Sequence, residues 1–591
     1  MKSKLIAFLV IASFIFVVGC GKKENKMKKD QKVQPSTSAQ AAGPIIKDYE
    51  NLDVIKNQLD KYFPVDIPYD ASKLTDKEKK ALFMMVRASQ LMDSIFSRQV
   101  YSKNGILKKE LKAWYEKNPE FKYLLKYFTL NAGPFDRLDN HKSFINLSVP
   151  KPLGANFYPE DMTKQEFEDY IKANPEKEKE FVSPYTVIRR ENGKLFPLAY
   201  SLYYDKPLAK AAKLLKKAAD QIDNPSLKKY LLSRADAFLS NDYYQSDLDW
   251  MDLKDHKIEF VIGPYEVYED RLFGYKASFE AFVTLVDQQE SQKMAKVSKN
   301  MLEMEKNLPI EDKYKNFKRG SSAPILIVNE VYASGDTRAG VQTTAFNLPN
   351  DERVREAKGS KQVMLKNISQ AKFENSFMPI AKEVVAKSDL PSVSFDAYFN
   401  FVLMHEISHG LGPGNIVKNG KNTNVNKELK ELYSTIEEAK ADVLGMYNAQ
   451  FLIGKGILAK KIEKELYPSY LAGFFRSIRF GIDEAHGGAT AIQFNYIVEK
   501  QGFSYDPKTG RFSVNNAKIK DVIKQLGKEL LEIQATGDYD RAKKFIDKYR
   551  FVSKDVKQAL DRVANVPTDI RQKFLIEADI KEADAKAKKA K

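Results

Sequence analysis

The chain has 591 residues, of which 43% are hydrophobic and 12% aromatic, and its formal net charge at pH 7 is +17. This length and composition exclude a small disulfide-stapled fold and a wholly disordered protein, and they allow roughly two to four domains. Part of the positive charge lies in two terminal stretches, residues 21–32 and 581–591, and no basic run is interleaved with aromatic residues. We therefore expect a solvated surface of mixed charge and no nucleic-acid partner.

The N-terminus has the layout of an export signal. Two lysines precede an apolar run from Leu5 to Val18, which is too short to span a bilayer comfortably. The next residues, "VVGC", resemble a bacterial lipobox, in which the cysteine is lipidated, and Cys20 is the only cysteine in the chain. We expect residues 1–19 to be a lipoprotein signal peptide and Cys20 to anchor the exported protein to a bacterial membrane, at the periplasmic face or the cell surface. A plain signal peptide and a short membrane anchor are the alternatives.

Residues 20–46 are predicted to form a flexible tether, because the stretch "QPSTSAQAAGP" is rich in small and turn-forming residues. Apolar residues recur at three and four spacing after the tether, which predicts helices over 74–100, 205–223 and 225–241. β-branched and aromatic residues predict strands within 256–270 and 323–334. Helical patterns return from about residue 394 and run to the end. We expect a helix-rich protein with a small sheet between helical regions.

The stretch "HEISHGLGPGN", residues 405–415, contains the first chemical motif. Ser394 is a possible helix cap and Gly410 a possible helix end, so the intervening segment is predicted to be helical. His405 and His409 then lie one turn apart on one face, where both imidazoles can bind one tetrahedral Zn²⁺. Glu406 can lie beside the metal-bound water as a general base. A helix with two histidines that serve only the fold is the alternative.

A second amphipathic helix, "YSTIEEAKADVLGMYNAQ", offers the carboxylates that such a site needs. Glu437 and Glu438 are followed by Asp442, and the four-residue spacing from Glu438 to Asp442 brings two carboxylates to one face. One carboxylate can bind the metal while the other accepts the outer N–H of a ligating histidine. A solvated acidic helix face is the alternative for this segment taken alone.

His486, in "GIDEAHGGATAIQFNYI", is the third histidine of interest among five in the chain. An imidazole near a zinc site can donate a hydrogen bond to the oxyanion that forms when water attacks a carbonyl. By its local sequence alone, His486 fits a core or surface histidine better than a catalytic one.

The motifs "HEISHG", "EEAKAD", "EAHGG" and "FNLPNDERVR" together resemble the dipeptidyl peptidase III family, with the best match between residues 259 and 486. This resemblance implies one zinc ion, held by His405, His409 and Glu438, with Glu406 as the base. It further implies that Glu437 and Asp442 orient the ligating histidines and that His486 stabilises the transition state. Asn347, Asn350 and Glu259 match residues that bind the substrate.

The resemblance also implies the fold: two lobes around a substrate cleft, one helical and zinc-binding, the other containing a small β-barrel or sheet. The expected class is mainly α with this small β part (α+β). The predicted lower lobe comprises residues 47–280 and 331–376 with part of the C-terminus. Residues 281–330 and 377–548 are predicted to form the zinc-binding lobe, and 549–591 C-terminal helices and a basic tail.

Three positions depart from the family pattern. The two histidines have the five-residue H-E-x-x-H spacing, whereas most members have one more residue between them. Val261 stands where a catalytic tyrosine is expected, and neither Tyr265 nor Tyr268 has the right register; losing such a donor costs roughly 3 kcal/mol, or ~100-fold in rate. Thr490 replaces an arginine that commonly contacts the carboxyl side of the substrate, so we expect a difference in substrate length or class.

The sequence thus predicts a monomeric zinc exopeptidase that removes dipeptides from the N-terminus of short peptides by Glu-assisted attack of a zinc-bound water. A catalytically weak enzyme, a zinc hydrolase acting on non-peptide amides or esters, and a peptide-binding lipoprotein that retains the metal site are the alternatives. Val261 favours the weak or non-catalytic alternatives, whereas Glu406 favours the enzyme, because a purely structural zinc needs no base.

Overall fold

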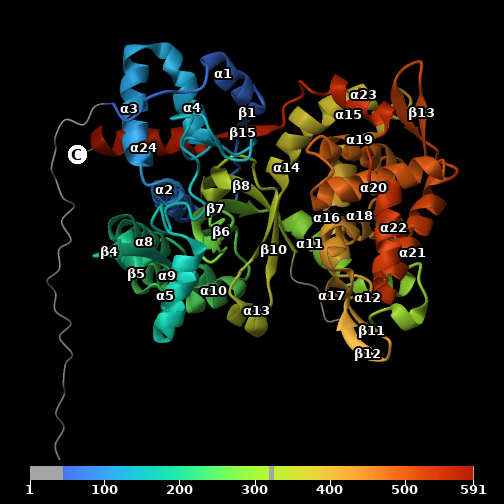
Figure 1. Ribbon diagram of the computed structural model, residues 1–591, viewed down its shortest axis with the longest axis horizontal. Helices are drawn as coiled ribbons and strands as arrows, with labels where there is room; N and C mark the ends of the chain where they lie inside the picture. Colours follow the sequence, from blue (N-terminus) through green and yellow to red (C-terminus); the bar gives the residue numbers. More distant parts are fainter. Residues whose placement is uncertain (1–43, 318–324, 590–591) are drawn as a thin grey trace, which may run out of the picture. The chain divides into compact units, whose positions relative to one another are not determined.

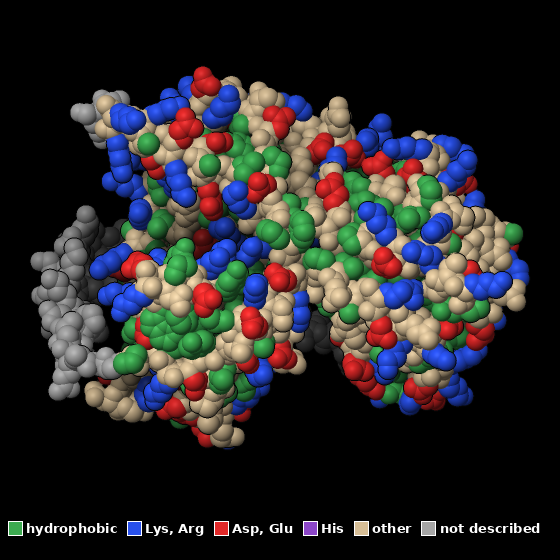
Figure 2. Space-filling view, turned by 90° about the horizontal axis from the view of Figure 1, so that it is seen from above, with side chains coloured by type: hydrophobic (Ala, Val, Ile, Leu, Met, Phe, Trp, Pro, Cys, Tyr) green, Lys and Arg blue, Asp and Glu red, His purple; other side chains and the backbone are tan. Residues whose placement is uncertain are grey.

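The computed structural model describes residues 44–317 and 325–589, and residues 46–591 form one compact unit. The predicted signal peptide, Cys20 and nearly all of the predicted tether lie outside the described residues. No helix in the described parts of the chain is both long and apolar enough to cross a membrane. Lys and Arg side chains alternate with Asp and Glu over the face drawn in Figure 2, as expected for a solvated surface of mixed charge.

The fold is mainly helical (Figure 1). The helices are α1 (Leu52–Asp60), α2 (Asp76–Val100), α3 (Asn104–Lys117), α4 (Lys122–Leu130), α5 (Lys164–Ala173), α6 (Glu178–Phe181), α7 (Tyr200–Tyr203), α8 (Asp205–Ala219), α9 (Pro225–Ser240), α10 (Tyr244–Met251), α11 (Gln288–Ser298), α12 (Met301–Asn307), α13 (Glu352–Lys358), α14 (Lys366–Lys372), α15 (Met378–Val384), α16 (Phe395–His409), α17 (Val425–Leu429), α18 (Tyr433–Gly454), α19 (Leu466–Ile478), α20 (Ala485–Glu499), α21 (Ile519–Thr536), α22 (Tyr539–Tyr549), α23 (Lys554–Arg562) and α24 (Ile576–Lys589).

The strands are fewer and shorter. They are β1 (Tyr62–Ile67), β2 (Phe135–Asp136), β3 (Lys142–Ser143), β4 (Thr186–Glu191), β5 (Lys194–Ala199), β6 (Ile258–Glu266), β7 (Ser278–Val286), β8 (Ile325–Gly335), β9 (Ala345–Leu348), β10 (Lys361–Leu365), β11 (Asn415–Lys418), β12 (Lys421–Asn424), β13 (Phe503–Asp506), β14 (Arg511–Val514) and β15 (Asp569–Phe574).

The largest sheet has five strands in the order β6-β7-β8-β10-β9. Strands β8 and β10 are parallel and the other neighbours antiparallel, so the sheet is mixed. Among the described strands β6 and β9 form its two edges, and no ladder joins them into a closed barrel. The sequence prediction of a mainly helical protein with a small sheet is therefore confirmed.

The buried apolar residues form two clusters that share this sheet. The N-terminal cluster contains residues of α2, α5 to α10, α14 and α24 and of several strands, β15 among them, whereas the helical cluster contains residues of α11, α12 and α15 to α23. Ile327 and Met364 belong to the helical cluster, whereas the neighbouring Val328 and Val363 belong to the N-terminal one. Because successive side chains of a strand point to opposite faces, β8 and β10 present one face to each cluster. This double burial explains the almost continuously apolar run of β8.

The helices predicted from residues 205 and 225 begin where α8 and α9 begin, whereas the helix predicted from residue 74 begins at Asp76, and the structure shows what caps α2 and α16. Thr75 and Glu78 form a reciprocal capping box before α2, and the Ser394 side chain accepts a hydrogen bond from the Ala397 N–H at the start of α16. Helices return at α16 and continue to α24, and the short hairpins β11-β12 and β13-β14 and the strand β15, which were not predicted from the sequence, lie between them. The hairpin β11-β12 turns at Asn419 and Gly420, both with positive φ, and this Asn-Gly pair is a sequence signal for a two-residue hairpin.

Candidate metal centre and active site

The candidate site is built on the contact between α16 and α18. Gly445 of α18 lies against the backbone of α16. A Cβ atom at this position would be 3.0 Å from the backbone nitrogen of His405. Because the residue is glycine, the two helices approach closely at the level of His405. This approach brings Glu437, Glu438 and Asp442 of α18 opposite the two histidines of α16.

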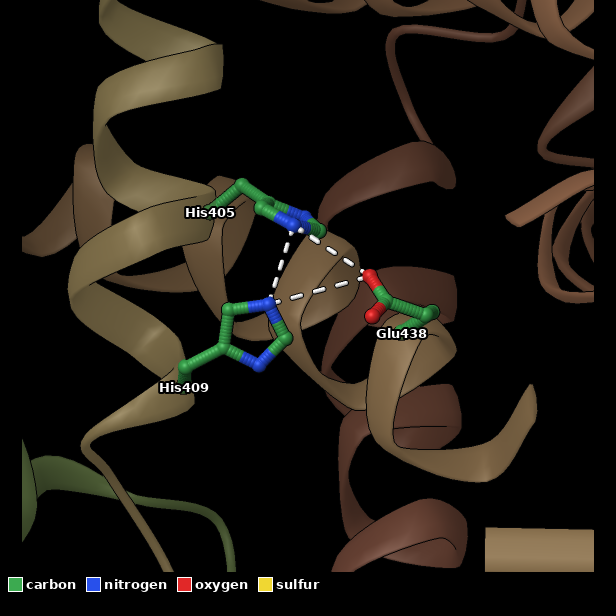
Figure 3. A group of neighbouring side chains, drawn as sticks. All are labelled: His405, His409 and Glu438. Atoms are coloured by element: carbon green, nitrogen blue, oxygen red, sulfur yellow. Dashed lines mark hydrogen bonds and ion pairs between the residues drawn. The ribbon is translucent and has the colours of Figure 1, made fainter. Parts of the chain in front are cut away.

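Three side chains converge at one point (Figure 3). His405 Nε2 and His409 Nε2 lie 3.1 Å apart. Glu438 Oε2 lies 3.4 Å from the first of these nitrogens and 3.7 Å from the second. The side chains are only 12%, 32% and 17% exposed, in the order His405, His409 and Glu438. Two nitrogens and one carboxylate oxygen therefore face a common, largely enclosed position.

The outer nitrogens of both histidines are already paired with carboxylates. His405 Nδ1 lies 2.7 Å from Asp442 Oδ1, and His409 Nδ1 lies 2.9 Å from Glu437 Oε1. A neutral imidazole that donates through Nδ1 presents a lone pair at Nε2, so both lone pairs point at the common position. Glu438 Oε2 is buried there and accepts a hydrogen bond from no described residue. Three electron-pair donors this close fit a metal cation.

Further groups hold these carboxylates in place. Gln493 of α20 donates to Asp442 Oδ2 at 2.8 Å, and Gln534 of α21 donates to Glu437 Oε2 at 2.8 Å. The Lys440 ammonium lies 2.8 Å from Glu437 Oε1. Each carboxylate therefore has one oxygen for its histidine and another for an amide. Such fixed partners orient the imidazole rings before a cation binds.

The charges of the cluster are reflected in its pKa values. Burial lowers the pKa of His405, but the adjacent Asp442 carboxylate outweighs burial, with help from Glu438 and Glu406, and the pKa is raised to about 10. Burial raises the pKa of Glu437, but the Lys440 ammonium and the His409 hydrogen bond lower it to about 2. The centre is therefore an anionic environment that favours positive charge.

Glu406 lies on α16 between the two histidines and is partly buried. Its Oε2 accepts a hydrogen bond of 2.7 Å from Gln362 Nε2 of β10. Gln362 and Met364 share a strand face, and Met364 packs in the helical cluster, so the period of two aims Gln362 at α16. This contact joins the sheet directly to the predicted general base.

His486 begins α20 at the edge of the centre. Its Nε2 lies 3.3 Å from Glu438 Oε2, and its side chain is 66% exposed. The N-cap Glu484 accepts a hydrogen bond of 3.1 Å from the His486 N–H. The structure thus brings His486 beside the cluster of His405, His409 and Glu438, with its ring accessible to solvent.

Glu259, predicted to bind substrate, lies elsewhere. It is 1% exposed, and its carboxylate is paired with Trp250 Nε1 at 2.5 Å, with His256 Nε2 and with Lys361 Nζ at 3.4 Å. A substrate contact would have to displace one of these partners, so this placement argues against a direct contact. Val261 is 1% exposed and packs in the N-terminal cluster.

The two asparagines are accessible. Asn347 of the edge strand β9 is exposed and pairs with Gln362 across the β9-β10 ladder. Directly paired residues of an antiparallel ladder have their side chains on the same face, so Asn347 shares the face from which Gln362 reaches Glu406. Asn350 is also exposed and donates to the Tyr265 carbonyl at 3.1 Å.

The sequence prediction missed three glutamines: Gln362, Gln493 and Gln534. Each contacts a carboxylate from an element far along the chain, at separations of 44, 51 and 97 residues. Gln493 follows His486 by seven residues, two helical turns, and this spacing was the available signal for a residue on the same face of α20. For Gln362 and Gln534 no comparable signal exists in the sequence.

Comparison with known proteins decides the family. The profile of Peptidase family M49 matches residues 162–453. A solved structure of dipeptidyl peptidase III from Caldithrix abyssi is 55% identical, covers 89% of this chain and 100% of its own, and superposes with a TM-score of 0.86. The chain belongs to the dipeptidyl peptidase III family. The family predicted from the motifs is therefore confirmed, and the protein is a metallopeptidase that releases dipeptides from the N-terminus of peptides.

A second solved structure agrees with this family. Dipeptidyl-peptidase III from Corallococcus sp. strain EGB is 43% identical, with a TM-score of 0.74 over 90% of this chain and 99% of that one. Nudix hydrolase 3 of Arabidopsis thaliana is 39% identical over 572 residues, which cover 88% of this chain and 74% of the plant protein. About a quarter of the plant protein therefore lies outside the match.

Proposed function

We propose that this member of the dipeptidyl peptidase III family is zinc-dependent and cleaves short peptides, with His405, His409 and Glu438 as the metal ligands. The observation that carries the proposal is the convergence of two Nε2 atoms and a buried Glu438 oxygen that accepts no hydrogen bond from a described residue. Two imidazoles and one carboxylate are the ligand set of several catalytic zinc sites, and they leave a fourth position open. When bound there, zinc supplies Lewis acidity that polarises the peptide carbonyl and makes water a better nucleophile.

Glu406 performs the proton transfers. Its carboxylate accepts a proton from the attacking water and returns it to the nitrogen of the leaving amine. Gln362 donates to one oxygen of this carboxylate at 2.7 Å, which fixes its orientation and leaves the other oxygen for the proton. Through an N–H of its accessible ring, His486 stabilises the negative charge that develops on the carbonyl oxygen.

Asn347 and Asn350 hold the amino-terminal end of the substrate. Asn347 supports this role because it is the exposed ladder partner of Gln362, which itself contacts the base. Paired residues lie about 5 Å apart, so a dipeptide between Asn347 and Glu406 is within reach of both. The family tyrosine has no substitute at Val261, which is buried, and we expect a slow enzyme for this reason.

The two apolar clusters correspond in this proposal to two lobes with the substrate between them. Residues 281–330 and 377–548 form the zinc-binding lobe, and residues 47–280 with 331–376 form most of the other. Every proposed catalytic residue comes from one chain, which supports action as a monomer. The residue ranges are inferred from sequence, and the distribution of buried residues between the clusters supports them.

The location of the enzyme is proposed from sequence alone. The apolar run before Cys20 supports export, and Cys20 supports lipid attachment to a bacterial membrane, facing the periplasm or the outside. Metabolic labelling with palmitate should mark the wild-type chain and fail to mark Cys20→Ser. Equal labelling of both chains would contradict the anchor.

The central experiment measures release of a fluorophore from dipeptidyl-arylamides by the purified full-length protein. We expect release that a chelator abolishes and that Glu406→Gln lowers by about 10²- to 10⁴-fold, while one metal ion per chain is retained. Glu356→Gln, an exposed position on α13, is the matched control and should keep full activity. Metal-loaded protein that releases no fluorophore would reject the peptidase mechanism in favour of another zinc hydrolase or of a peptide-binding protein.

A further inference from the structure

A small cavity of about 110 Å³ adjoins the metal centre, and we call it the α19 cavity. Residues of helices α16, α18, α19 and α20 line it, together with Phe377. It shares two residues with the centre: Asp442, which pairs with His405, and His486, which lies beside Glu438. A group bound in the α19 cavity would therefore lie next to the reacting bond.

Aromatic side chains make up most of its wall. On α16 the lining residues Tyr398, Phe401 and Val402 precede His405 by three to seven residues, so they lie on the same side of the helix, one to two turns before it. On α19 the lining residues Tyr470 and Phe474 are one turn apart. The wall suits an apolar part of a ligand.

Arg476 of α19 supplies a charge to this wall. Its side chain is half-buried, and its Nε is buried without a hydrogen-bond partner. Within residues 44–317 and 325–589 its guanidinium takes part in no hydrogen bond and no ion pair. Arg479, one turn further along α19, differs because it donates to the carbonyls of Val566 at 2.6 Å and Pro567 at 3.4 Å. An unpaired guanidinium in a cavity is a ready partner for an anion.

The surroundings of Arg476 do not neutralise it. Burial and then the positive charge of Arg476 lower the pKa of Arg479. Burial and the positive charge of Arg476 also lower the pKa of the nearby Lys372. The ammonium of Lys372 is paired with Asp569 at 2.9 Å. Asp442 is the one carboxylate that lines the described cavity, and its two oxygens are engaged by His405 and Gln493.

We propose that the α19 cavity binds the residue on the leaving side of the scissile bond and that Arg476 binds the C-terminal carboxylate of that residue. This inference rests on the proposed function. The cavity volume of about 110 Å³ corresponds to the liquid volume of roughly four water molecules. A cavity of this size suits the terminal residue of a peptide better than a peptide that continues through it. A planar guanidinium matches a carboxylate with two parallel hydrogen bonds.

The proposal accounts for the missing arginine at position 490. Thr490 also lines the α19 cavity, but its hydroxyl donates to the His486 carbonyl at 2.7 Å and carries no charge. Arg476 presents a guanidinium to the same space from the neighbouring helix. The preferred substrates are then tripeptides with a free C-terminal carboxylate, and Arg476 is the residue that determines this specificity.

The test compares peptide acids with the matching peptide amides. The tripeptide Ala-Ala-Phe, as acid and as amide, is titrated by calorimetry into metal-loaded full-length Glu406→Gln, which binds without cleaving. We expect the acid to bind about tenfold more tightly than the amide, or better. In Glu406→Gln combined with Arg476→Met the acid-to-amide ratio should fall to about one, and Arg476→Lys should give an intermediate ratio.

Arg479→Met in the same background is the matched control. It removes the same charge three residues away, and we expect it to keep the acid preference. Metal content, measured for every variant, reports an intact centre. Equal binding of acid and amide before any change at Arg476, or an acid preference that survives Arg476→Met, would overturn the proposal.

Arylamide substrates separate this proposal from the proposed function, because their leaving group carries no carboxylate. Arylamide release together with equal binding of acids and amides would reject the role of Arg476 and leave the peptidase intact. An acid preference that depends on Arg476, in a wild-type protein that releases no arylamine, would support the α19 cavity as a carboxylate site and reject the peptidase mechanism.

Discussion

Two networks of histidine and carboxylate side chains, one around Glu259 and one in the metal centre, use the same residue types for different purposes. In the sheet region Glu259 is surrounded by donors from Trp250, His256 and Lys361. In the metal centre Asp442 and Glu437 each accept from a histidine and a glutamine. Both arrangements satisfy their carboxylates.

The two networks differ in the surroundings of the second ring nitrogen of each histidine. His405 and His409 direct their second nitrogens at one another and at an oxygen of Glu438 that no described group satisfies. In the sheet network the donors surround the single carboxylate of Glu259. Lys361 also donates to the Trp250 carbonyl at 3.0 Å, and the second nitrogen of His256 is buried without a hydrogen-bond partner among the described residues. The metal centre is thus recognised by electron-pair donors that converge on one position, whereas in the sheet network hydrogen-bond donors surround one acceptor.

The largest expected effect comes from removing the acceptor on which the centre converges. Glu438→Ala leaves two protein ligands, so the enzyme should lose stoichiometric zinc and about 10³-fold or more of its kcat/KM. Glu259→Ala should retain one zinc per chain, because its network is separate. Metal analysis after dialysis and arylamide kinetics measure both. Zinc loss in Glu259→Ala with a folded protein would break the distinction between the networks.

The next effect concerns stability. Glu259→Gln keeps the shape of the side chain but leaves Lys361 and His256 without their carboxylate, and we expect a loss of about 3 kcal/mol at pH 7. Burial raises the pKa of Glu259, yet the Lys361 ammonium and the His256 hydrogen bond outweigh burial and hold it below 4.5. A lowered pKa stabilises the fold above the unfolded value and loses this contribution as the pH falls through the folded value.

The difference in melting temperature between wild type and Glu259→Gln should therefore be largest near neutral pH and shrink below pH 4.5. Thermal unfolding followed by circular dichroism at pH 7 and at pH 4 measures it. A difference that grows on acidification would contradict the assigned direction of the pKa shift.

The smallest effect is expected at the partner of a ligand. Asp442→Asn can still form a hydrogen bond but no longer has a charge to fix the His405 ring, so zinc affinity should fall about 10- to 100-fold while folding is preserved. Competition with a chelator of known affinity measures this. Asp396→Asn, on the exposed first turn of the same helix, should leave the affinity unchanged. Equal affinity in Asp442→Asn would mean that the outer hydrogen bond does not orient the ring.

Local signals made α16 and the ligand pair predictable, because the Ser394 cap, the apolar run and the four-residue histidine spacing all lie within one helix. The pairing of His405 with Asp442 and of His409 with Glu437 required the packing of α16 on α18, which family resemblance supplied. Gln362 and Arg476 belong to no motif. They reach the site through strand pairing and through the face of α19, and sequence periodicity does not say which neighbour a face will meet.

The position of β15 has a consequence for the order in which the chain folds. β15 pairs in parallel with β1, residue 569 beside residue 62, and Ile570 and Ile576 pack in the N-terminal cluster. The N-terminal cluster is therefore incomplete until residues 569–580 leave the ribosome, after the whole helical cluster has been synthesised. Contacts this distant along the chain form slowly, and until they do β1 remains an unpaired edge. Truncation at the C-terminus should thus destabilise the N-terminal cluster, which is synthesised first. A chaperone that keeps the N-terminal segment from folding or associating too early would raise the yield of folded enzyme.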